Sequence, residues 1–145
     1  MKAAAAHQRT VVRKHVYAGT LSPQETAAHI KRGLPVKEFD ALKELLGMTV
    51  EALARKVRIS IATLSRRRQR GGGLDVDHGD RVMRFARLYR LAVELYDGDE
   101  VAARLWLSKP ARALDGQTPL DFADTEAGAR EVENIIGRLE HGVYT

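Results

Sequence analysis

The stretch SIATLSRRRQRGGG, residues 60–73, concentrates cationic side chains at one point of the sequence. Four of its residues are arginines, and three consecutive glycines follow them. Arginine pairs bidentately with phosphate oxygens and with the major-groove edge of guanine. A short helix that carries these arginines either binds nucleic acid or is a solvated basic surface.

Other residue types that could do chemistry are not arranged for it. The histidines are His7, His15, His29, His78 and His141. No two of them are three or four residues apart, so we expect solvated histidines and no metal site. The acids of DVDHGD, residues 75–80, lack the length and the closing glutamate of a calcium loop, and we interpret them as helix-start acids. Without a phosphate-binding glycine motif or a nucleophile elbow, we expect no enzyme, no metal and no cofactor.

Composition limits the class of protein. The 145 residues are 44% hydrophobic, which suits one or two small globular domains. Cysteine is absent, so disulfides and thiolate metal sites are excluded. No apolar run approaches the roughly 20 residues that cross a bilayer, and the first residues lack the apolar segment of a secretory signal. We therefore expect a cytoplasmic protein with no membrane partner.

The net charge of +5 hides a division between the two halves of the chain. Residues 1–74 contain fifteen lysines and arginines and five acids, a balance of +10. Residues 75–145 contain nine lysines and arginines and fourteen acids, a balance of −5. The front half suits a polyanion, which the back half would repel.

The elements that must position these residues all have helical signals, and we predict an all-α fold. Ser22 to Glu25 form a capping box, and Gly33 and Pro35 close that helix. A second helix covers 36–46, and Thr49 and Ser60 are N-caps of two short helices.

After the glycines we predict a long helix from about 75–80 to about 96. Its apolar stripe is wider than one face, so we expect it to pack on two sides, one of them a second subunit. A helix at 99–107, a turn capped by Thr118 and a final helix at 125–141 complete the prediction, with Gly142 at the C′ position.

The segment LGMTVEALARKVRISIATLSRRRQRG, residues 46–71, has the pattern of two packed helices. Leu53 and Ala54 lie in the first helix, Ile59 in the turn, and Leu64 on the inner face of the second. Over about residues 35–74 the chain resembles the helix-turn-helix of Xre-type (lambda-repressor-like) regulators, and a generic helical hairpin is the alternative.

That resemblance implies roles for individual residues. Ser60 would meet a phosphate, Thr63 and Arg66 would reach base edges, and Ile61 and Ala62 would offer apolar contact. The implied DNA-binding residues are Lys56, Ser60, Ile61, Ala62, Thr63, Arg66, Arg67, Arg68 and Arg70. The chain departs from the family pattern in two places: Arg58 replaces the usual turn glycine, and Arg67 replaces an inward apolar residue.

From Trp106 onward the sequence reads WLSKPARALDGQTPLDFADTEAGAREVENIIGRLEHGVYT. It resembles the C-terminal toxin-binding domain of the Xre/MbcA/ParS antitoxin family in its tryptophan, prolines, glycines and final RLEHG, in order and register. Taken singly, each of these residues is also explained by core packing or helix capping. Packing does not explain the last residues, where an acidic helix ends at Gly142 before an aromatic Tyr144.

Members of that family neutralise RES-domain toxins, which deplete NAD, and the complex commonly represses its own operon. The resemblance implies that the final helix and residues 142–145 cover the toxin's active-site cleft, with Tyr144 in the place of a base or ribose. The implied toxin-binding residues are Arg130, Asn134, Arg138, His141, Gly142, Val143, Tyr144 and Thr145. The implied partners are a RES-domain toxin, operator DNA and a second copy of the chain, in a larger complex.

We thus predict four segments: a flexible arm at 1–20, an Xre-like helix-turn-helix domain at 21–74, a linking and dimerisation helix at 75–96 and a toxin-binding domain at 97–145. The main alternative is a stand-alone dimeric Xre-type transcriptional repressor. A ParS-like interaction module that has no toxin is a further alternative.

Overall fold

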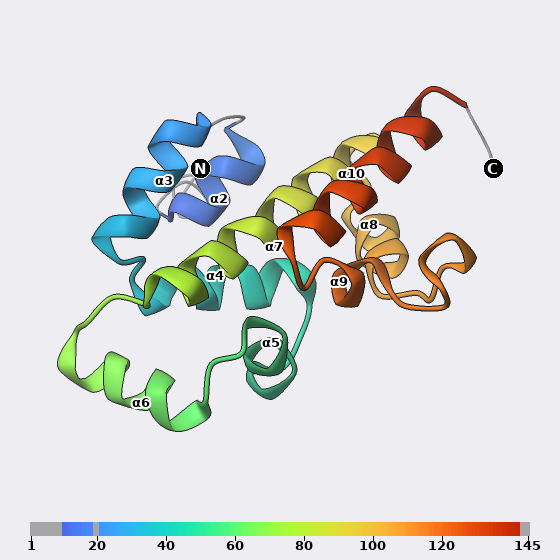
Figure 1. The fold of residues 1–145 in the computed structure, drawn as a ribbon. Coiled ribbons are helices and arrows are strands. Elements are labelled where there is room, and N and C mark those ends of the chain that lie inside the picture. Colours follow the sequence, from blue (N-terminus) through green and yellow to red (C-terminus); the bar gives the residue numbers. More distant parts are fainter. Residues whose placement is uncertain (1–9, 19–20, 143–145) are drawn as a thin grey trace. The chain divides into compact units, whose positions relative to one another are not determined.

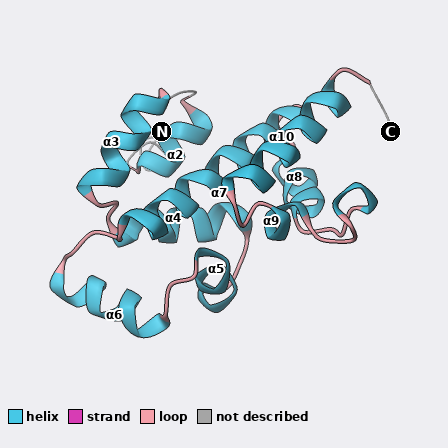
Figure 2. Cartoon of the chain, in the orientation of Figure 1, coloured by secondary structure: helices cyan, strands magenta, loops and turns pink. Residues whose placement is uncertain are grey.

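A computed structural model describes residues 10–18 and 21–142, and within these ranges the chain is helical with no strand (Figure 1 and Figure 2). The prediction of an all-α fold is confirmed. The chain divides into two compact units, Met1–Ala86 and Arg87–Thr145.

The first unit is built around α4. Its helices are α2 (Val11–Tyr17), α3 (Pro23–Arg32), α4 (Val36–Leu46), α5 (Val50–Val57), α6 (Ile61–Arg70) and the first part of α7 (Val76–Leu95). Helix α4 packs against α2, α5 and α6. Phe39 and Leu42 of α4 and Leu53 of α5 are fully buried and form the centre of this core.

Local signals set the helix starts that the sequence predicts. The capping box of Ser22 and Glu25 is present, with Pro23 at the first helical position. Thr49 and Ser60 each accept a hydrogen bond from the N3 backbone N–H of the helix that follows. These caps satisfy N–H groups that would otherwise lack a partner at a helix start.

Residues 11–17 form a helix, which corrects the prediction of a flexible arm for that segment. Val12, His15 and Val16 of this helix, α2, are buried, so His15 is not solvated as predicted. The cause is a distant residue: the buried carboxylate of Glu38 in α4 accepts hydrogen bonds from the first N–H groups of α2. The rest of the predicted arm, residues 1–9 and 19–20, lies outside the described residues.

The glycine run that ends α6 is a point of close backbone approach. A Cβ built on Gly73 would lie 2.8 Å from the carbonyl carbon and oxygen of Gly33. Beside this crossing, the N–H of Leu74 donates a 2.7 Å hydrogen bond to the carbonyl of Leu34. Only glycine at position 73 lets the two chain segments meet at this distance.

The second unit contains a small helical cluster. Its elements are the remainder of α7, α8 (Glu100–Leu107), a 3₁₀ turn (Arg112–Leu114), α9 (Pro119–Phe122) and α10 (Glu126–Glu140). Helix α9 packs against α8 and α10. The buried side chains of Leu107, Leu114, Leu120, Val132 and Ile136 form much of this core.

Two polar side chains of α7 tie this helix to the rest of the second unit. The hydroxyl of Tyr89, which is fully buried, donates a 2.5 Å hydrogen bond to Glu100. The guanidinium of Arg87 binds both Glu126 and Glu133 of α10, at 2.9 and 2.5 Å. The predicted cap at Thr118 is present at the start of α9, and Thr125 caps α10.

Helix α7 occupies most of the segment predicted as the linking and dimerisation helix, 75–96. The boundary between the units falls inside it, after Ala86. Val82, Phe85 and Ala86 before the boundary, and Leu88 and Tyr89 after it, are almost fully buried. This burial within one chain accounts for the wide apolar stripe without a second subunit, and the homodimer stays a prediction. Within the described residues no helix, α7 included, has the length and hydropathy to cross a membrane.

Candidate functional site

Helices α5 and α6 and the turn between them form the predicted helix-turn-helix. Ala54, the small residue expected at the helix contact, is 3% exposed, and Leu64 of α6 is 2% exposed. Ile59 in the turn is also buried, and its N–H donates to the carbonyl of Ala54. Both helices pack against α4, and the short turn between them sets the position of α6 as the second helix of such a motif.

Arg58 adopts the left-handed conformation that the turn requires, with φ 65°. Its N–H donates to the carbonyl of Arg55 and so closes the C-terminus of α5. The backbone therefore follows the family's turn although the residue is not glycine. A non-glycine residue accepts this conformation at a cost of about 1–2 kcal/mol.

The arginines of α6 lie on two sides of the helix. Because successive helical residues turn by about 100°, Arg67 and Arg68 flank the buried Leu64, and Arg66 and Arg70 lie on the opposite side. Arg66, Arg68 and Arg70 are exposed, and Arg67 is half-buried. Ile61, at the start of α6, is 44% exposed, which is high for a large apolar side chain.

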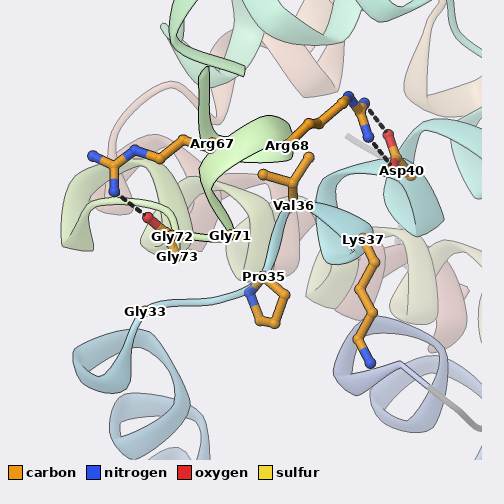
Figure 3. Close-up of a pocket in the computed structure, with 10 residues that line it drawn as sticks. All are labelled: Gly33, Pro35, Val36, Lys37, Asp40, Arg67, Arg68, Gly71, Gly72 and Gly73. Carbon is orange, nitrogen blue, oxygen red and sulfur yellow. Dashed lines mark hydrogen bonds and ion pairs between the residues drawn. The ribbon is translucent and has the colours of Figure 1, made fainter. Parts of the chain in front are cut away.

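Arg67 and Arg68 bind their own protein at an open hollow of roughly 600 Å³ (Figure 3). Arg68 makes two hydrogen bonds of 2.6 Å to the carboxylate of Asp40 in α4. The hydrogen bond to Asp40 raises the pKa of Arg68 above its already high ordinary value. Arg67 donates to the carbonyl of Gly73 and pairs with Asp75 at 2.8 Å. A DNA phosphate would have to compete with these partners for both arginines.

A chain of hydrogen bonds links the exposed polar residues of α6. The hydroxyl of Ser60 accepts from the N–H of Thr63 at 3.0 Å and donates to the hydroxyl of Thr63 at 2.8 Å. The Nη2 of Arg66 donates to the same Thr63 oxygen at 3.1 Å. The residues assigned to phosphate and base contact are thus joined on one exposed surface.

In the second unit, α10 presents the predicted polar stripe. Arg130, Asn134 and Arg138 follow each other at four-residue intervals, and the first two are exposed. Arg130 and Arg138 face acids of the same helix, at 4.0 Å from Glu126 and 3.5 Å from Glu131. The helix ends at exposed His141 and Gly142. The other predicted contacts, Val143, Tyr144 and Thr145, lie outside the described residues.

Two surface features of this unit are not among the predicted sites. Val101 and Leu105, four residues apart on α8, are 59% and 66% exposed. An apolar pair at this spacing was the signal that could have revealed them. Between α9 and α10, Asp121, Asp124 and Glu131 line an open hollow of roughly 470 Å³. No local signal predicts that hollow, because its shape depends on how the two helices pack.

The two units coincide with two family models. Residues 25–87 match the antitoxin Xre-like helix-turn-helix domain, and residues 91–142 match the antitoxin Xre/MbcA/ParS C-terminal toxin-binding domain. The break between the matches falls in α7, as does the boundary between the compact units. Fold and sites together define a bipartite antitoxin, with a helix-turn-helix domain followed by a toxin-binding domain.

Similar proteins agree with this class. Antitoxin Xre of Photorhabdus laumondii is 37% identical over 118 residues, which cover 81% of this chain and 80% of the relative. Antitoxin Xre of Yersinia enterocolitica is 35% identical over 116 residues, which cover 80% of this chain and 78% of the relative. A protein of a Sphingobium species named Prs ADP-ribosylating antitoxin is 22% identical over 131 residues, which cover 85% and 82%. The chain belongs to the Xre antitoxin family.

Proposed function

We propose that this antitoxin binds a RES-domain toxin that consumes NAD and neutralises it by covering its active site. The observation that carries the proposal is the match of residues 91–142 to the family's toxin-binding domain. The antitoxin acts by binding and performs no chemistry of its own.

The charge of the second half supports a toxin that uses a nucleotide. Residues 75–145 have a balance of −5, and an acidic surface complements a basic cleft that binds NAD phosphates. The name of the Sphingobium relative refers to ADP-ribosylation, and reactions of that class take the ADP-ribose group from NAD. A partner that consumes NAD is consistent with both observations.

The proposed contact surface is the polar stripe of α10 and the residues that follow the helix. Arg130, Asn134 and Arg138 provide donors along one side of α10. His141 to Thr145 would enter the cleft, where the ring of Tyr144 takes the place of a base or ribose. Substituting Tyr144→Ala would then weaken inhibition of the toxin about tenfold or more and leave the fold unchanged.

The helix-turn-helix gives the protein a second proposed role, repression of its own operon in the cytoplasm by a homodimer in complex with the toxin. The proposed DNA contacts are Lys56, Ser60, Ile61, Ala62, Thr63, Arg66, Arg67, Arg68 and Arg70. Of the four arginines of α6, Arg66 and Arg70 lie on the side away from the core, so they contribute most. The balance of +10 over residues 1–74 favours the approach of DNA.

The test is cellular NAD after a RES-domain toxin encoded beside this gene is induced, with and without this protein. We expect NAD to fall with the toxin alone and to hold when the antitoxin is present. A matched variant that lacks residues 87–145 should give no protection. If the toxin depletes NAD equally with the full chain present, the proposal is wrong, and a stand-alone dimeric repressor becomes the better account.

A further inference from the structure

Within α6, one arginine is held in place on the exposed surface by side chains of the same helix. Arg66 donates from Nη2 to the hydroxyl oxygen of Thr63 at 3.1 Å, and Ser60 fixes that hydroxyl by its own 2.8 Å hydrogen bond. Ser60 is also the N-cap residue of α6, so the first link of the chain is anchored in the backbone. A side chain fixed before binding loses less conformational entropy when it binds.

The contact with Thr63 occupies one of the five N–H donors of the guanidinium, so Arg66 still has a pair of N–H donors for a ligand. In the major groove, guanine presents two acceptors, N7 and O6, that match two such donors. The N-terminal residues of the second helix of a helix-turn-helix are those that contact base edges. Arg66 lies six residues after the N-cap, on the side of α6 opposite Leu64.

The neighbouring arginines are unsuited to the same task. Arg68 is occupied by two hydrogen bonds to Asp40, and Arg67 by Gly73 and Asp75. Arg70 is the last residue of α6 before the αL residue Gly71. The four arginines therefore have different tasks, although the sequence presents them as one basic cluster.

We propose that Arg66, positioned by Thr63, reads a guanine in the operator, and that Arg67 and Arg68 have no part in base recognition. This inference rests on the proposed DNA binding and adds the identity of the base and of the positioning residue.

The experiment uses the full chain, alone and saturated with its toxin, to select duplexes from a pool of random sequence. Affinity is then measured for the selected site and for versions in which each guanine in turn is replaced by 7-deazaguanine, which lacks the N7 acceptor. For wild type, one such replacement should weaken binding about 5-fold to 150-fold, the range expected for a bidentate contact. Arg66→Lys keeps the charge but not the bidentate pair, so it should abolish that discrimination. Arg55→Lys, at an exposed arginine of α5 outside the proposed DNA contacts, is the matched control and should retain it.

Thr63 is tested through the same discrimination, because a structural role would change affinity for all duplexes equally. Thr63→Val removes the hydroxyl at nearly constant shape and should reduce the guanine preference, and Thr63→Ser should restore it. If duplexes are selected but Arg66→Lys retains the guanine preference, or Thr63→Val retains it in full, the inference is wrong and DNA binding still stands. If no duplex is enriched under either condition, the proposed DNA binding itself fails.

Discussion

The N–H of Val12 donates a 2.8 Å hydrogen bond to the carboxylate of Glu38, a residue 26 positions later in the chain. Both residues are almost fully buried, and the other carboxylate oxygen accepts from Val11 at 2.9 Å. Glu38 thus acts as a cap for α2 from a different helix. Together with the local N-cap at Thr10, whose hydroxyl accepts a hydrogen bond from the N–H of Arg13, this contact holds α2 as a helix against α4.

Glu38→Gln is expected to lower the free energy of unfolding by about 1–3 kcal/mol. The glutamine side chain keeps one acceptor oxygen, but its NH₂ group replaces the other oxygen. One of the two backbone N–H groups at the start of α2 then faces a donor and loses its hydrogen bond. Urea denaturation measures the change, and amide exchange should show α2 opening before the rest of the first unit. Glu44→Gln is the matched control: it removes the exposed Arg13–Glu44 ion pair between the same two helices and should cost under about 1 kcal/mol. Equal effects of the two changes would show that Glu38 has no special role.

Gly128 and Gly137 provide a matched pair of glycines on α10. A Cβ at Gly128 would collide with the carbonyl oxygen of Phe122, and a Cβ at Gly137 would meet no atom within 4 Å. Gly128→Ala should therefore destabilise the second unit by about 1–3 kcal/mol, as overpacking does. Gly137→Ala should stabilise it by about 0.5–1 kcal/mol, because alanine favours the helix. Thermal unfolding of both variants tests the packing of α10 on α9, and opposite signs are required.

Asp40→Asn should strengthen DNA binding. The substitution removes the partner that holds Arg68, so Arg68 becomes available to a phosphate. Affinity for a selected duplex should rise several-fold, and the slope of log affinity against log salt should steepen by about 1. The double variant Asp40→Asn, Arg68→Ala controls for the loss of an acid near the DNA. A gain that persists in the double variant would mean that Arg68 is not the residue released.

Arg130→Glu should weaken toxin binding at least tenfold. Arg130 is exposed on the polar stripe of α10, so the substitution removes the donors of the proposed contact and places a carboxylate against the acceptors they would meet, with little effect on the fold. Arg112→Glu makes the same change at an exposed site outside that stripe and should leave binding unaltered. Isothermal titration of the antitoxin with its toxin measures both. If the two variants bind the toxin with equal affinity, the α10 stripe is not part of the interface.

The parts of this structure that the sequence predicted are those set by local interactions. The caps at Ser22, Thr49, Ser60 and Thr118 each depend on residues within three positions, and all are present. The left-handed conformation of Arg58 could also be predicted from the sequence, because the turn pattern dictates the backbone conformation at that position.

The parts that the sequence did not predict depend on distant partners. Glu38 capping α2 and Asp40 holding Arg68 join residues at least 26 positions apart. A run of arginines looks uniform in the sequence, and the packing of α6 on α4 gives its members different partners. The same holds for Gly73, whose necessity comes from Gly33 on another segment.

The most direct test of the central proposal is the rate at which a purified RES-domain toxin consumes NAD as this antitoxin is added. Because the antitoxin is proposed to cover the active site, we expect the rate to fall to the background at a fixed molar ratio, in parallel with formation of the complex. A complex that forms but consumes NAD at the full rate would contradict the covering of the active site. If no complex forms with the toxin, the proposed partner is wrong.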